Sequence, residues 1–267
     1  MNQDQASSIG ISVDTWAGLK PVSEHDHVAV EVPVALVYNG VSHAVMLASP
    51  GDLADLALGF SLSEAIAAGP DDVLGIEARH ADDGVTVDIE LTARAEARLG
   101  ARRRTLVGTT GCGLCGVESL QQALREVAPV TSSTTVLASV IGQAPGLLGP
   151  AQPVRSATGA VHVAAWIGTD GMLNVAREDV GRHNAMDKLI GTLARGERGK
   201  GFALISSRAS YEMVQKAACV GIDVLVAVSA PTSLAVERAQ RLGLTLVGFA
   251  RGGSFKVYTQ PQRILRA

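Results

Sequence analysis

The pattern of apolar and polar positions predicts strands with one helix in the first hundred residues. Residues 1–20 are mostly polar and predict a flexible tail. Apolar runs then flank Asn39-Gly40, and this dipeptide favours the tight turn of a β-hairpin. A helix is predicted next, with Ser49 as its cap and Pro50 at its first position. Two further strands are predicted on either side of Asp82-Asp83-Gly84, which completes an α+β unit.

The last hundred residues alternate between strand and helix patterns. Apolar runs predict strands at 161–168, 202–207, 223–230 and 244–250, and amphipathic stretches predict helices at 181–196, 210–221 and 232–243. Two of the strands are nearly continuous apolar runs, which is typical of a central sheet covered on both faces. Alternation at this spacing predicts a largely parallel sheet. Ligands of such sheets bind beyond the C-terminal ends of the strands.

The stretch between these two parts is rich in Pro, Ser, Thr and Gly. Residues 129–160 therefore predict a domain boundary or a flexible connection. We assign residues 21–128 to a smaller N-terminal α+β domain, which ends in a Cys-x-x-Cys loop and a short helix at 117–128. Residues 129–267 form the C-terminal α/β domain.

Composition and charge narrow the class of protein. The chain has 267 residues, of which 47% are hydrophobic and 18% charged, as in globular proteins. Its net charge of −3 provides no basic field for nucleic acid or an anionic membrane. The first 20 residues contain no signal-peptide core, and no run reaches the roughly 18 apolar residues of a membrane span. We therefore expect a cytoplasmic protein without a membrane segment.

The pair Cys112-Gly113-Leu114-Cys115 has three possible chemistries. A structural zinc site needs about four ligands, and the chain has no second Cys-x-x-Cys or His-x-x-x-His to complete it. Dithiol exchange fits a pair that opens a helix, but the surrounding pattern is not that of a thioredoxin domain. A persulfide carrier needs a reachable thiolate, and a helix N-terminus with neighbouring glycines favours one. Cys219 is interpreted as a buried helix thiol.

Two further groups of residues point to an anionic ligand. Arg208 and Arg251 follow predicted strands, at the edge where ligands of parallel sheets bind. Arg182 and His183 begin a predicted helix, where exposed N–H groups favour phosphate. The alternative for this second group is an ordinary solvated helix, with Asp179 as a cap and Asp187 and Lys188 on a polar face.

The chain resembles the formate dehydrogenase accessory sulfurtransferases, the FdhD/NarQ family. Seven ordered segments carry this resemblance over nearly the whole chain beyond the tail: EVPVALVYNGVSHAVMLASPGDLADLALGFSLSE, GCGLCG, TGAVHVAA, REDVGRHNAMDKLIG, SRASYEMVQKAA, VSAPTSLAV and GFARGGSFKVYT. One departure is Ala160, where the family pattern has a second glycine after Gly159.

The resemblance implies an α/β fold with a cytidine-deaminase-like three-layer C-terminal domain. Zinc deaminases, however, use a His-x-Glu segment followed by Pro-Cys-x-x-Cys. The nearest candidate here, His162-Val163-Ala164, lacks the glutamate, and the Cys-x-x-Cys pair precedes it without a proline. The shared fold therefore predicts neither deaminase activity nor a metal site.

The resemblance also implies a function and its residues. Cys112 matches the family's persulfide cysteine and Cys115 its partner; the sulfur donor is a cysteine desulfurase. The acceptor is the molybdenum cofactor, bis-molybdopterin guanine dinucleotide, before its insertion into formate dehydrogenase. The family's cofactor-binding loop corresponds to Phe249, Ala250, Arg251, Gly252, Gly253 and Ser254. To these we add Arg208 and His183 as our own inference, and the resemblance further implies a homodimer. The alternatives are a non-enzymatic cofactor-binding chaperone and a dithiol oxidoreductase.

Overall fold

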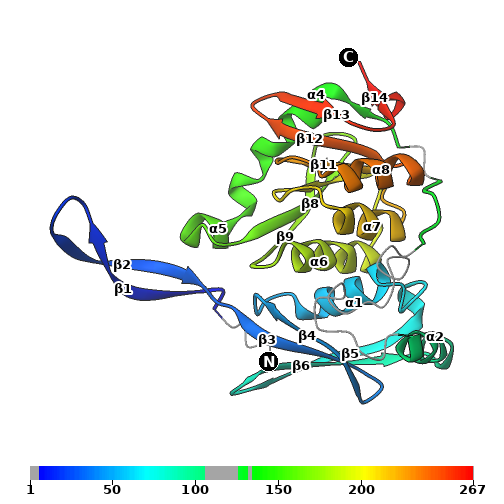
Figure 1. Cartoon of the computed structure of the whole chain (residues 1–267), viewed down its shortest axis with the longest axis horizontal. Coiled ribbons are helices and arrows are strands. Elements are labelled where there is room, and N and C mark those ends of the chain that lie inside the picture. Colours follow the sequence, from blue (N-terminus) through cyan, green and yellow to red (C-terminus); the bar gives the residue numbers. More distant parts are fainter. Residues whose placement is uncertain (1–5, 106–125, 132–133, 267) are drawn as a thin grey trace.

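An extended two-stranded ribbon lies at the N-terminal end of the described chain. The computed structural model describes residues 6–105, 126–131 and 134–266 (Figure 1). Strands β1 (Ser8–Trp16) and β2 (Pro21–Ala29) pair antiparallel and project away from the other elements. We call residues 8–29 the arm. Residues 8–16, which were expected to belong to a loose tail, are thus a strand, because Ile9, Ile11 and Val13 alternate with small or polar residues.

The N-terminal part of the fold is a four-stranded sheet in the order β4-β3-β6-β5. Its strands are β3 (Val32–Tyr38), β4 (Val41–Ala48), β5 (Val73–Ala81) and β6 (Gly84–Leu91). The predicted hairpin at Asn39-Gly40 is confirmed: both residues have positive φ, 46° and 79°, which the tight turn requires. Residues Val34 and Leu36 bury one sheet face against helices α1 (Leu53–Ser63) and α2 (Ala93–Thr105). A 3₁₀ turn, η1 (Pro70–Asp72), leads into β5.

Helix α1 begins later than the sequence predicts. Its N-cap is Asp52 in a left-handed conformation, so neither Ser49 nor Pro50 takes the position expected of it. The hydroxyl of Ser49 accepts a hydrogen bond from the N–H of Val180 instead of capping α1. A contact between residues 131 positions apart has therefore replaced a local one.

The C-terminal part contains a six-stranded sheet in the order β13-β12-β11-β10-β8-β9. Its strands are β8 (His162–Gly168), β9 (Leu173–Asp179), β10 (Gly201–Ile205), β11 (Val224–Ala227), β12 (Thr245–Arg251) and β13 (Ser254–Val257). Only β10, β11 and β12 pair in parallel, so the expectation of a largely parallel sheet is wrong. The difference arises because β9 and β13 return by short turns, which join antiparallel strands.

Both faces of this sheet are covered, as predicted. Three helices pack on one face: α6 (Arg182–Arg195), α7 (Tyr211–Cys219) and α8 (Ser233–Leu242). The other face is covered by the segment that the sequence predicts to be a boundary or flexible connection. Its residues Ile141, Ala144 and Leu148 pack against the sheet. That segment contains β7 (Val136–Leu137), α4 (Ala138–Gln143), η2 (Ala144–Leu147), η3 (Gly149–Ala151) and α5 (Pro153–Thr158). Near the C-terminus, η4 (Pro261–Arg263) precedes β14 (Ile264–Leu265), which pairs with β7.

Two glycines allow the two parts of the fold to pack closely where α1 crosses α6. Helix α1 lies between the four-stranded sheet and α6 (Figure 1). A Cβ on Gly59 of α1 would lie 1.7 Å from the carbonyl oxygen of Asp187, and one on Gly191 of α6 would lie 1.9 Å from that of Asp55. Each helix therefore presses its backbone onto the other, and only glycine permits this approach.

No helix in the described ranges is long and apolar enough to cross a membrane.

Candidate functional site

The topology of the six-stranded sheet gathers the predicted ligand residues at one edge. Strands β10, β11 and β12 are parallel, so their C-terminal ends share that edge. Strand β8 runs antiparallel to β10 and begins there at His162, whereas β9 ends there and leads into α6. Arg208, His183 and residues 249–254 therefore all lie along one edge, which we call the ligand edge. The sequence predicts this position for Arg208 and Arg251, which follow strands, and not for His183.

Backbone hydrogen bonds hold the three loops at this edge side by side. The N–H of Ala209 donates to the oxygen of Ala230 at 3.2 Å, and the N–H of Thr232 donates to the oxygen of Ala209 at 3.1 Å. The N–H of Phe249 donates to the oxygen of Ser229 at 3.1 Å. The loops after β10, β11 and β12 thus form one connected surface, on which the side chain of Arg208 is exposed.

The loop after β12 is a tight turn whose outer residues face solvent. Gly252 and Gly253 adopt left-handed conformations, with φ of 57° and 78°, and connect β12 to β13. Arg251 and Ser254 flank the turn and are exposed, and the Ser254 hydroxyl donates to the oxygen of Arg251 at 3.0 Å. Ala250 is fully buried in the core, so only its backbone remains for a ligand.

Phe249 also has a strained backbone, with a φ of 55°. The ammonium of Lys256 lies 5.0 Å from the centre of its ring, which places a second cation beside Arg251 in this hairpin. The exposed turn therefore lies in a hairpin that carries two cationic side chains.

His183 lies at the same edge but apart from this turn. Helix α6 begins beyond β9, which is four strand spacings from β12, roughly 19 Å. Burial lowers the pKa of His183 to about 4, together with the positive charges of Arg182 and Lys216. Its Nε2 atom and the Nε atom of Arg182 are buried and have no hydrogen-bond partner within the described part of the chain.

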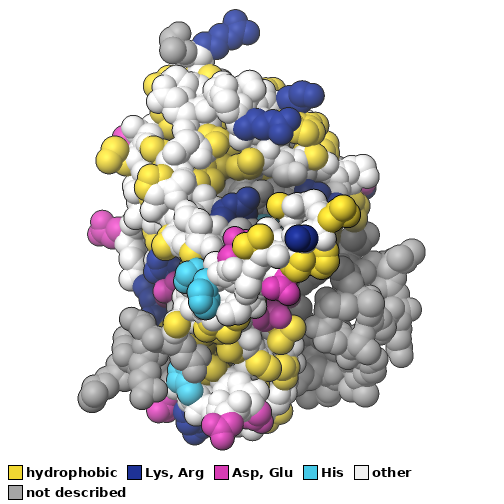
Figure 2. Space-filling model, turned by 90° about the vertical axis from the view of Figure 1, so that its left-hand side faces the viewer, with side chains coloured by type: hydrophobic (Ala, Val, Ile, Leu, Met, Phe, Trp, Pro, Cys, Tyr) yellow, Lys and Arg dark blue, Asp and Glu magenta, His cyan; other side chains and the backbone are white. Residues whose placement is uncertain are grey.

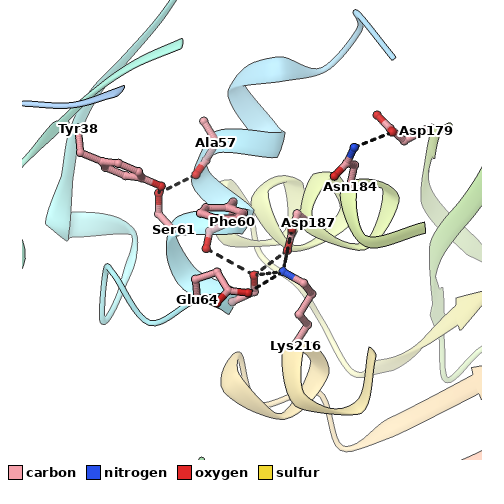
Figure 3. Close-up of polar contacts among 10 residues, drawn as sticks. Tyr38, Ala57, Phe60, Ser61, Glu64, Asp179, Asn184, Asp187 and Lys216 are labelled. Atoms are coloured by element: carbon pink, nitrogen blue, oxygen red, sulfur yellow. Dashed lines mark hydrogen bonds and ion pairs between the residues drawn. The ribbon is translucent and has the colours of Figure 1, made fainter. Parts of the chain in front are cut away.

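Sequence reasoning missed the polar residues buried beneath this edge. Asp187 and Lys188, which were expected on a solvated helix face, are 1% and 0% exposed. The carboxylate of Asp187 accepts from the ammonium of Lys216 at 2.9 Å and from the hydroxyl of Ser63 at 2.6 Å (Figure 3). The same ammonium reaches Glu64 at 3.1 Å. Burial raises the pKa of Asp187, and Lys216 counteracts this effect. These contacts join α1, α6 and α7.

Asp179 is the centre of a second buried network. Its carboxylate pairs with the ammonium of Lys188 at 2.7 Å and accepts from the N–H of Ser49 at 3.0 Å. It also accepts from the N–H of Gly181 at 2.8 Å and from the side-chain amide of Asn184 at 3.0 Å. Gly181, not Asp179, is the N-cap of α6. Asp179 therefore links the loop before α1 to the start of α6.

Most of the chain, from the end of β2 onward, matches a family model. Residues 29–265 match that of the FdhD/NarQ family. The chain belongs to this family. The match begins at the last residue of β2 and contains both sheets and the entire ligand edge. The resemblance seen in the seven sequence segments is thereby confirmed.

Named relatives of this FdhD/NarQ chain are similar over almost all of its length. A sulfur carrier protein FdhD from Cupriavidus necator is 51% identical over 255 residues, which is 95% of this chain and 88% of the relative. One of the same name from Bordetella bronchiseptica is 50% identical over 92% of this chain and 90% of its own. A formate dehydrogenase accessory protein from Desulfotalea psychrophila has a solved structure with a TM-score of 0.77, at 24% identity, over 97% of this chain and all of its own. The mixed α/β fold is thus shared with that structure.

Of the three cysteines of this FdhD/NarQ chain, the structure describes Cys219. Cys112, Cys115 and most of the helix expected at 117–128 lie outside the described residues. Cys219 ends α7 and lines a cavity of about 450 Å³ together with Leu62, Ile190 and Arg198. The expectation of a buried helix thiol is corrected, because Cys219 is only half-buried. Among the described residues, no group of three His, Cys, Asp or Glu side chains is placed to hold a metal.

The low pKa of His183 predicts that the stability of the folded protein decreases at acidic pH. Its folded pKa of about 4 lies below the unfolded value of about 6.5, so protonation favours the unfolded chain. The stabilisation that neutral His183 provides is complete above pH 6.5 and is lost as the pH falls towards 4. An NMR titration of the His183 ring is expected to show a midpoint near 4 in the folded protein. In urea the same ring should titrate near 6.5, and a folded midpoint at or above 6 would contradict the burial argument.

Proposed function

We propose that this protein is a sulfur carrier in the maturation of formate dehydrogenase. The observation that carries the proposal is its 51% identity to a named sulfur carrier protein FdhD over 95% of the chain. The Cys-x-x-Cys pair, which has one glycine between its cysteines and one on each side, supplies the nucleophile that this function needs. Cys112 accepts the sulfur and Cys115 assists it. The protein thereby acts as a sulfurtransferase in the cytoplasm.

The sulfur enters as a persulfide from a cysteine desulfurase. The thiolate of Cys112 attacks the outer sulfur of the donor persulfide, which breaks the donor S–S bond and forms a new one on Cys112. The donor leaves as a thiolate, so neither an oxidant nor a reductant is required. The thiolate of Cys115 then attacks the inner sulfur on Cys112, which breaks the persulfide bond, forms a Cys112–Cys115 disulfide and releases the outer sulfur as sulfide. The acceptor of this sulfide is the molybdenum cofactor, bis-molybdopterin guanine dinucleotide, which is the cargo of the reaction, and a cellular dithiol reductant restores both thiols.

The ligand edge suits the guanine-nucleotide end of this cargo. Arg251 is exposed beside the Gly252-Gly253 turn, and Arg208 is exposed on the neighbouring loop. Cationic side chains and oriented backbone N–H groups are the usual partners of phosphate. We assign His183, at the start of α6 along the same edge, to the same cargo site. We also propose a homodimer, and a cytidine-deaminase-like arrangement for the three C-terminal layers.

Persulfide loading tests the sulfur-carrier proposal. After incubation with a cysteine desulfurase and L-cysteine, the peptide containing Cys112 is expected to gain the mass of one sulfur atom. Cys112→Ala should remove this species, whereas Cys219→Ala is the matched control and should retain it. Absence of added sulfur on both Cys112 and Cys115 would contradict sulfur carriage. Formate dehydrogenase activity restored in cells by the Cys112→Ala, Cys115→Ala double variant would instead favour a cofactor-binding chaperone.

Binding of a guanine nucleotide tests the cargo site. Arg251→Ala is expected to weaken binding of GDP by about 10- to 100-fold, the usual cost of losing a charge-assisted hydrogen bond. Arg241→Ala is the matched control, because Arg241 is an exposed arginine of α8 that pairs with Glu237 away from the ligand edge. Isothermal titration calorimetry measures both variants. Equal affinities of Arg251→Ala and the unchanged protein for GDP would show that Arg251 is not part of the binding site.

A further inference from the structure

Tyr258, directly after β13, carries an exposed aromatic ring on a rigid backbone. The residue is 37% exposed, and its N–H donates to the oxygen of Leu246 at 2.8 Å. The next residue, Thr259, is also fixed to β12 and its approach. Its hydroxyl donates to the oxygen of Leu244 at 2.6 Å and accepts from the N–H of Leu246 at 2.9 Å. The backbone that presents the ring is therefore held in place by the sheet.

The ring of Tyr258 lies next to the loop after β11. A Cβ on Gly248 of β12 would lie 2.8 Å from Cδ of Pro231 and 3.1 Å from Cε2 of Tyr258. Both rings therefore lie over the bare α-carbon of Gly248, and a larger residue there would displace them. Pro231 belongs to one of the three connected loops of the ligand edge. The missing side chain at position 248 thus brings the ring of Tyr258 to that edge.

Tyr258 differs in exposure from the other aromatic residues in the described loops of this edge. Tyr211 is buried, and the ammonium of Lys256 lies over the ring of Phe249. The ring of Tyr258 therefore offers exposed aromatic surface beside the turn at residues 251–254. Planar aromatic surface of this kind stacks on nucleic acid bases.

A cationic side chain projects from the same face of the hairpin as Tyr258. Lys256 lies two residues before Tyr258, so the two side chains point to the same side of the strand. In the register of β12 and β13 Lys256 is opposite Gly248, over which the ring of Tyr258 lies. Lys256 is exposed. Figure 2 looks onto the side where this hairpin turns, at the left in Figure 1, and shows Lys and Arg side chains beside hydrophobic ones in its upper part.

We propose that Tyr258 and Lys256 form the subsite that recognises the guanine base of the cargo, while Arg251 takes its phosphates. The ring of Tyr258 stacks on the base, and the ammonium of Lys256 donates to guanine O6 and N7. Adenine has an amino donor in place of O6, which a lysine ammonium repels. Gly248 lies three residues before Arg251, roughly 10 Å at the rise of a strand, so one hairpin carries both subsites. The inference rests on the cargo site proposed above and is independent of sulfur carriage.

Isothermal titration calorimetry of the full-length protein with GDP, ADP and inorganic pyrophosphate tests this subsite. The unchanged protein is expected to bind GDP more tightly than ADP. Tyr258→Ala should weaken GDP binding about 10-fold and leave pyrophosphate binding unchanged, because pyrophosphate has no base to stack. Tyr258→Phe keeps the ring and should keep the affinity for GDP. Lys256→Met should lower the ratio of GDP affinity to ADP affinity about 10-fold.

Met172→Ala is the matched control, because it removes a side chain that is 64% exposed in the turn between β8 and β9, at the opposite edge of the same sheet. It should leave all three affinities unchanged. Unchanged GDP binding by Tyr258→Ala, or an equal loss of pyrophosphate binding, would overturn the stacking while preserving the cargo site. An unchanged GDP-to-ADP ratio in Lys256→Met would overturn base recognition by Lys256. Failure of the unchanged protein to bind GDP would overturn the subsite and the cargo site together, and persulfide loading would remain a separate test of sulfur carriage.

Discussion

Asp179→Ala is expected to lower the free energy of unfolding by about 3–5 kcal/mol, the usual cost of leaving one partner of a buried ion pair without its counter-charge. The ammonium of Lys188 lies 2.7 Å from Asp179, and both residues are fully buried. The substitution also deprives the N–H groups of Ser49 and Gly181 of their acceptor. Equilibrium urea denaturation followed by circular dichroism measures the change.

Two further substitutions separate the effect of the Asp179 charge on stability from the effect of removing any aspartate. Asp179→Asn keeps an acceptor oxygen and removes the charge. Its free energy of unfolding is therefore expected to lie between those of the unchanged protein and Asp179→Ala. Asp83→Ala changes an exposed turn residue and should alter the free energy of unfolding by no more than about 0.5 kcal/mol. A loss below about 1 kcal/mol for Asp179→Ala would mean that water or another group replaces the carboxylate.

Gly59→Ala is expected to destabilise the protein by about 3 kcal/mol, at the upper end of the cost of overpacking a close contact. The new Cβ would lie 1.7 Å from the carbonyl oxygen of Asp187 and 2.8 Å from the nitrogen of Gly191. These atoms belong to the backbone of α6, so the two helices must separate. Separation also disturbs the contacts of Asp187 with Ser63 and Lys216. The midpoint of urea denaturation should fall accordingly.

A glycine in another helix provides the control. A Cβ on Gly100 of α2 meets no atom within 4 Å, so Gly100→Ala should leave stability unchanged or raise it by up to about 1 kcal/mol through helix propensity. Gly59→Ala is therefore expected to lower the stability, and Gly100→Ala is expected not to lower it. Equal effects would show that the crossing of α1 and α6 adapts without cost.

Much of the ligand edge was predictable because it depends on local chemistry. Strand and helix periodicity located the elements that end there, and Arg208 and Arg251 follow directly from those elements. The number of strands between β9, which leads to His183, and β12, which ends at Arg251, was not predictable, since it depends on the order of strands across the sheet. Short antiparallel returns to β9 and β13 made the sheet mixed, which the helix spacing alone does not reveal.

By itself, the sequence determined the position of most elements, the Asn39-Gly40 turn, the Cys112/Cys115 pair and the family. Each of these depends on residues near one another in the chain or on ordered motifs. Only the tertiary structure decided that Asp187 and Lys188 are buried, because a charged pair on a helix has the same pattern in solvent or in a core. Their partners Lys216 and Asp179 come from other elements. Such contacts arise from packing between distant segments, which local periodicity does not encode.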